Sequence, residues 1–118
     1  MADQIAATGL KVVNGDVVGD DTLFPWEPYP EDWTIDDAVW GYGAPVSALT
    51  INDNQISVTV APGDAMGKPA TLTLSPDVPY YKLDFSVTTG APGSPDSVAM
   101  ERLPGSRELR IYGSIAAD

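Results

Sequence analysis

Short segments in which apolar and polar residues alternate cover most of the chain from Val46 to Tyr112, and they constrain the fold more than any other feature. The clearest is Tyr80–Val87, where Tyr81, Leu83, Phe85 and Val87 fall on one face and polar residues on the other. Alternation with a period of two indicates a half-buried β-strand. The same pattern occurs in residues 46–51, 55–60, 71–75, 98–103 and 108–112. Strands this short, with turns about every ten residues, predict an all-β, antiparallel β-sandwich.

Turn residues between these segments predict how the strands connect. Asn52-Asp53-Asn54 would join residues 46–51 to residues 55–60 as a hairpin, and Pro104-Gly105-Ser106 would join the last two segments. Thr88–Asp96 holds two glycines and two prolines, which favours a long exposed loop. We therefore expect a β-sandwich core over residues 46–118.

Residues 1–45 are predicted to form an N-terminal arm and an aromatic–proline segment, within a single domain overall. Residues 1–8 are small and polar and predict a mobile terminus. Short β-like stretches follow at Leu10–Val13 and Val17-Val18. Thr34–Trp40 is the one plausible helical turn, with Thr34 as its cap.

Composition excludes several classes of function. The chain has 118 residues, no cysteine and no histidine, so thiol nucleophiles, disulfides and the commonest acid–base and metal-binding group are absent. The net charge of -11 disfavours nucleic-acid and membrane-surface partners, because both are anionic. No signal peptide or apolar spanning run follows Met1, so synthesis in the cytoplasm is expected. These features predict a protein that is not an enzyme and has no cofactor.

A dense aromatic segment, FPWEPYPEDWTIDDAVWGY, stands apart from the strands. It holds six of the ten aromatic residues, all three tryptophans and three prolines. Two interpretations remain open: the rings fold back over an edge or end of the sandwich, or some of them form a docking surface. The candidate partner-binding residues are Phe24, Trp26, Tyr29, Trp33, Trp40 and Tyr42.

Clustered carboxylates give weaker candidates. Adjacent acids in a strand or turn point in opposite directions, which argues against a two-carboxylate glycosidase site. Asp16, Asp20 and Asp21 lie on a glycine-containing loop and are weak calcium candidates, although solvated turn residues are the default interpretation. Aromatic rings beside carboxylates could also stack on sugars. Arg102, Arg107 and Arg110 surround the second predicted hairpin, and we expect surface pairs with nearby glutamates.

The run Ile56–Ser75, ISVTVAPGDAMGKPATLTLS, resembles bacterial and phage immunoglobulin-like domains of the Big type. Pro62, Asp64, Ala65 and Lys68 occupy comparable places in the turn between two strands. This resemblance implies an immunoglobulin-like sandwich with an adhesive or structural role in a virion.

Together these features predict a non-enzymatic virion structural protein, most plausibly a phage capsid decoration (cement) protein or an accessory head or tail protein. Its partners would be capsid or tail subunits and sister copies, in a homo-oligomer or multi-copy array. An alternative is a carbohydrate- or receptor-binding module of a fibre or adhesin. A third possibility is a surface adhesion domain from a larger chain. The expected location is the virion, after synthesis in the host cytoplasm.

Overall fold

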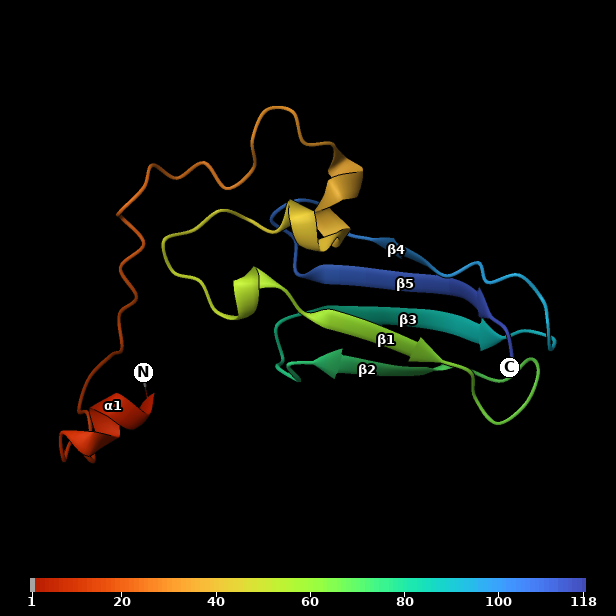
Figure 1. Ribbon diagram of the computed structural model, residues 1–118, viewed down its shortest axis with the longest axis horizontal. Helices are drawn as coiled ribbons and strands as arrows, with labels where there is room; N and C mark the ends of the chain where they lie inside the picture. Colours follow the sequence, from red (N-terminus) through yellow and green to blue (C-terminus); the bar gives the residue numbers. More distant parts are fainter. Residues whose placement is uncertain (1) are drawn as a thin grey trace.

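Two small sheets form the ordered centre of the protein in this computed structural model, which describes residues 2–118 (Figure 1). Met1, part of the terminus predicted to be mobile, lies outside the described residues. The strands are β1 Ser57–Ala61, β2 Thr71–Ser75, β3 Lys82–Thr89, β4 Ala99–Glu101 and β5 Glu108–Ile115. One short α-helix and three 3-10 turns complete the elements: α1 Ala2–Ala7, η1 Ile35–Val39, η2 Gly41–Gly43 and η3 Asn52–Asn54.

The two sheets have different topologies. Strands β1 and β2 form an antiparallel pair, in which Thr59 lies opposite Thr73. The second sheet has the order β3-β5-β4, with β5 parallel to β3 and antiparallel to β4. The predicted hairpin around Pro104-Gly105-Ser106 is confirmed by the β4–β5 pairing. The parallel β3–β5 pair departs from the antiparallel arrangement that was predicted throughout.

The two sheets are joined where the loop after β1 returns along the end of β3. Ala70 N donates to Val87 O at 2.9 Å, and Thr89 N donates to Lys68 O at 2.8 Å. The Thr89 hydroxyl accepts from Gly63 N at 2.8 Å, which satisfies a side chain that is almost fully buried. These bonds fix the β1–β2 pair against one end of the larger sheet.

A small core lies between the sheets. Its buried members are Ala70, Val87, Leu109 and Ile111. Partly buried side chains from both sheets pack around them: Val58, Val60, Leu72, Tyr81, Phe85, Met100 and Ile115. Strand β1 passes over β3 with β2 beside it, so two strands face a sheet of three (Figure 1). The immunoglobulin-like sandwich therefore stays a prediction, since the described strands form two facing sheets that do not close.

The predicted hairpin between residues 46–51 and 55–60 is wrong. Asn52, Asp53 and Asn54 all have positive φ, at 51°, 52° and 55°, and form the turn η3. Three consecutive left-handed residues redirect the chain, and β1 pairs with β2 instead. Side-chain bonds hold this turn: Asn54 Nδ2 donates to Pro45 O at 3.2 Å, and Asn52 Nδ2 donates to Gln55 O at 2.7 Å.

The N-terminal part also differs from prediction. Residues 2–7 form helix α1, and the β-like stretches at Leu10–Val13 and Val17-Val18 form no strand. Their valines are exposed, and the segment runs away from the sheets (Figure 1). Helix α1 is too short and too polar to cross a bilayer, and the other helical segments in residues 2–118 are shorter still.

Candidate functional site

The turn η1 forms from its own capping residues. Thr34 N donates to the Asp37 carboxylate at 2.8 Å, and Asp37 N donates back to Thr34 O at 3.1 Å. Trp40 N then closes the turn on Asp37 O at 3.0 Å. Thr34 thus occupies the N-cap position as the sequence predicted, but these bonds to Asp37 use its backbone N–H and carbonyl rather than a capping hydroxyl, and the turn is 3-10 and spans only Ile35–Val39.

Arg102 fixes η1 against the second sheet. Its guanidinium donates through Nε and Nη2 to the carbonyl oxygen of Ala38, and through Nη1 to Ser106 O at 3.3 Å. The guanidinium carbon also lies 5.9 Å from the centre of the Tyr81 ring. Ala38 itself is buried. Arg102 thus ties η1 to the β4–β5 hairpin with a planar donor that reaches two carbonyls at once.

The expected surface role of the arginines is wrong for Arg102 and right for Arg110. Arg110 lies 3.3 Å from Glu101 and 3.7 Å from Asp84, on the exposed face of the sheet. Lys82, rather than an arginine, pairs with Glu108 at 2.9 Å. The Arg110–Glu101 pair was expected from the predicted hairpin, whereas the Lys82–Glu108 pair was not. The Arg102–Ala38 contact joins residues 64 positions apart, and no local pattern indicated it.

The aromatic segment divides into a docked part and an exposed part. Tyr29 and Trp33 are half-buried, and the Tyr29 hydroxyl accepts from Gly105 N at 3.2 Å. Phe24, Trp26, Trp40 and Tyr42 are exposed, with Trp26 at 74% and Tyr42 at 68%. Four of the six candidate partner-binding residues thus present their rings to solvent, which keeps a docking role for them a prediction.

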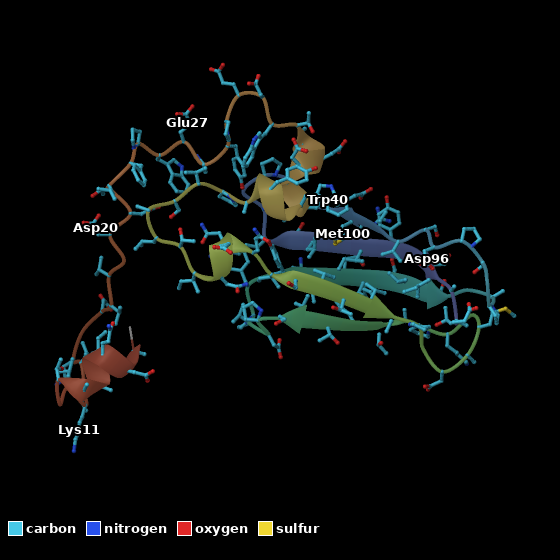
Figure 2. The ribbon with its side chains drawn as sticks, in the orientation of Figure 1. Lys11, Asp20, Glu27, Trp40, Asp96 and Met100 are labelled. Atoms are coloured by element: carbon cyan, nitrogen blue, oxygen red, sulfur yellow. The ribbon has the colours of Figure 1, made fainter. Side chains whose placement is uncertain are left out.

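A groove of about 1220 Å³ lies between β1 and the β5–β4 part of the second sheet. Apolar and charged side chains line it together, and Trp40 and Met100, which are labelled in Figure 2, are among the lining residues. The apolar lining residues include Val58, Val60, Met100, Leu109, Ile111 and Ile115. A second hollow of about 240 Å³ continues between η1–η2 and β1. The groove follows the uncovered inner surface of the two facing sheets and extends to charged side chains at its border.

The weak calcium candidates serve other contacts. The Asp21 carboxylate accepts from Ser47 Oγ at 2.9 Å, Ala48 N at 2.6 Å and Leu49 N at 3.2 Å. The Ser47 hydroxyl bond, ahead of the amide bonds, lowers the pKa of Asp21 below its ordinary value. Within residues 2–118, no three acidic side chains gather as metal ligands. Asp21 instead fastens the N-terminal segment to the loop at residues 47–49.

The Asp20 carboxylate also accepts hydrogen bonds, in this case from a residue two positions away. The Asp20 carboxylate accepts from the Thr22 hydroxyl at 2.6 Å and from Thr22 N at 3.0 Å. The hydroxyl bond, followed by the amide bond, lowers the pKa of Asp20. Asp16 is exposed on the segment before it. These acids shape turns in the N-terminal segment.

Comparison with known proteins identifies relatives over the whole chain. The sequence profile of the D-Ala-D-Ala carboxypeptidase 3 (S13) family matches residues 1–118. A D-alanyl-D-alanine carboxypeptidase from Actinomadura sp. (strain R39) is 36% identical over 124 residues. That alignment covers 100% of this chain and 23% of the relative, so the chain spans about a quarter of the relative's length.

These relatives overturn the function predicted from the sequence. The resemblance to Big-type domains was carried by a twenty-residue β-turn-β pattern, a geometry that many β-proteins share, whereas the peptidase match extends over all 118 residues. A non-enzymatic virion protein, a capsid decoration role and a virion location are therefore wrong. The absence of histidine and cysteine misled the prediction, because it excludes only some catalytic groups.

The matched range includes the aromatic segment, both sheets and the residues that line the groove. The chain belongs to the D-Ala-D-Ala carboxypeptidase 3 (S13) family, a family of peptidases.

Proposed function

We propose that this chain works as part of a D-Ala-D-Ala carboxypeptidase, an enzyme that hydrolyses the last peptide bond of a chain ending in D-Ala-D-Ala. Water adds across that bond, and the products are free D-alanine and a peptide that ends in one D-Ala. The observation that carries the proposal is the family match over residues 1–118, supported by 36% identity to a carboxypeptidase of this specificity.

The proposal also assigns the nucleophile to a region outside these residues. Penicillin-binding proteins and class A β-lactamases use a serine nucleophile in a Ser-x-x-Lys motif. The positions three residues before Lys11, Lys68 and Lys82 hold Thr8, Ala65 and Pro79, so that spacing does not occur here. Residues 1–118 would then form a β-rich frame beside the catalytic region, with the groove facing other parts of the enzyme.

A chimera tests the proposal. The matched segment of the Actinomadura carboxypeptidase would be replaced by residues 1–118, and D-alanine release from a synthetic tripeptide ending in D-Ala-D-Ala would be measured. We expect release within about tenfold of the parent enzyme, because 36% identity preserves the fold and its packing surfaces. The matched control replaces the same segment with a Gly/Ser linker and should release far less.

Two results would contradict this. A chimera that melts cooperatively like the parent but releases no D-alanine would refute a shared function. Release of D-alanine by the isolated 118-residue chain would refute the assignment of the nucleophile to another region.

A further inference from the structure

The chain exposes far more surface than a compact protein of its size. Its accessible surface is 8986 Å², whereas a compact monomer of 12.4 kDa exposes about 6,100 Å². Its radius of gyration is 18.8 Å, against about 13.5 Å for a compact chain of this length. The excess of about 2,900 Å² exceeds the roughly 1,200–2,000 Å² that a standard stable interface buries in total. The extended N-terminal segment contributes part of this excess, and the uncovered surface of the sheets contributes another part.

Part of the exposed apolar surface lies at the groove, and most of the rest lies on the N-terminal segment. Ile35 and Trp40 on its rim are 64% and 53% exposed, and Leu83 on its floor is 40% exposed. Large apolar side chains gathered along one hollow mark an interaction site rather than scattered surface residues. In Figure 1, β1 crosses in front of β3 and β2 lies on the side away from β5, while no strand is drawn over β5 and β4.

The free edge of β1 borders this uncovered face. Strand β1 pairs with β2 on one side, and no other backbone partner contacts Ser57–Ala61 among residues 2–118. Val58 and Val60 of β1 turn into the groove beside that edge. An unpaired strand edge is a template for a further strand. A strand added to β1 would lie over β5 and β4 and cover the inner face of the sheet.

The charged side chains that border the groove indicate what kind of segment would fit into it. Five carboxylates and three cations border the groove. Three ion pairs join Lys82 and Arg110 to three of these acids, and Arg102 donates to carbonyl oxygens, which leaves Asp36 and Asp96 outside the ion pairs. The whole chain carries a net charge of -11, so a second copy would be repelled. A segment with basic residues beside an apolar stripe fits this surface.

We propose that the groove receives an extended segment from the remainder of the carboxypeptidase, which pairs with the free edge of β1 and carries basic residues. The inference rests on the proposed function, which supplies the rest of the enzyme. The Actinomadura relative has about three-quarters of its length outside the matched region, so such a segment is available there.

Hydrogen exchange tests the added strand. Alternate amides of a strand in an antiparallel pair point away from its partner. In the isolated chain the outward amides of Ser57–Ala61 should exchange freely. In the folded chimera they should slow by at least about tenfold, because a new strand protects them. Equal exchange in the isolated chain and in the folded chimera would overturn the proposal.

This readout is separate from the test of function. Protection of β1 without D-alanine release would support the proposal that a strand fills the groove, and it would refute the proposed function. D-alanine release without protection of β1 would support the proposed function and refute the proposal that a strand fills the groove.

A second measurement uses only the isolated chain. Overlapping synthetic peptides that cover the unmatched part of the Actinomadura carboxypeptidase would be screened for binding to it. We expect binding to a basic, alternating segment, weakened about tenfold or more by Ile35→Lys at the groove rim. The matched control is Met66→Lys, which changes an equally exposed side chain (67%) outside the groove.

Three outcomes would refute the proposal. They are the absence of binding to any peptide, binding that Ile35→Lys leaves unchanged, and concentration-dependent dimerisation that Ile35→Lys abolishes in sedimentation equilibrium. The last would assign the groove to a second copy.

Discussion

Replacing Arg102 with methionine keeps an apolar stem of similar length and removes every donor that fastens η1. The guanidinium makes two bonds to Ala38 O and one to Ser106 O. A hydrogen bond from a charged donor contributes about 1.5–3 kcal/mol. Arg102 is only half-buried and its bonds share one side chain, so a total loss of about 2 kcal/mol is the reasonable magnitude. That loss corresponds to an increase of about 30-fold in the local opening of η1.

Native-state hydrogen exchange measures this opening at single amides. The amides of Asp37 and Trp40 are bonded within η1 and should exchange about 30-fold faster in Arg102→Met. The amide of Ala70 is bonded to Val87 O in the core and serves as the internal reference. The matched control is Arg107→Met, because Arg107 lies 5.0 Å from the Tyr80 ring and is exposed.

Unchanged exchange at Asp37 and Trp40 in Arg102→Met would refute the clamp. Equal acceleration in both arginine variants would also refute it, because Arg107 does not contact η1.

Three further predictions concern stability. Asp53→Gly should raise the free energy of unfolding by up to about 1 kcal/mol in thermal denaturation, because glycine adopts φ near 52° without strain; destabilisation would contradict this. Ile111→Ala should lower the free energy of unfolding by about 2–5 kcal/mol in urea titration, since this side chain is fully buried in a small core. A loss under about 1 kcal/mol would contradict this, because it would mean that neighbouring side chains close the cavity. Asp21 has a lowered pKa in the folded state, so its contribution is present above the ordinary value of 3.8 and is lost as the pH falls through the folded pKa. The amide signals of Ala48 and Leu49 should shift over that range in NMR titration, and Asp21→Asn should abolish the shift.

The family assignment shows where reasoning from residues failed. Turn chemistry and strand alternation around Ile56–Ser75 resemble many β-proteins, because they report local backbone geometry. Peptidase function depends on groups brought together from distant parts of a chain. The sequence of 118 residues contains no Ser-x-x-Lys spacing, so its own motifs gave no indication of a peptidase family.

The sequence predicted those elements whose structure depends on residues close together in the chain. The alternation in Tyr80–Val87 and Glu108–Tyr112 predicted β3 and β5, because a period of two specifies a strand with one buried face. Thr34 predicted the turn η1, since its cap is made within four residues. The six aromatic candidates were identified as a group, and the structure exposes four of them.

Pairing and exposure were decided only by the tertiary structure. Alternation does not say which strand lies beside which, so the parallel β3–β5 pair and the redirected β1 were not predictable from the pattern. The turn at Asn52–Asn54 has residues typical of a hairpin, yet its left-handed backbone sends the chain elsewhere. Arg102 reaches Ala38 across 64 positions, a contact that no local signal encodes. The sequence alone determined strands, one cap and an acidic aromatic segment, because these depend on near neighbours. The groove exists because the two sheets face each other incompletely, and that depends on the whole fold.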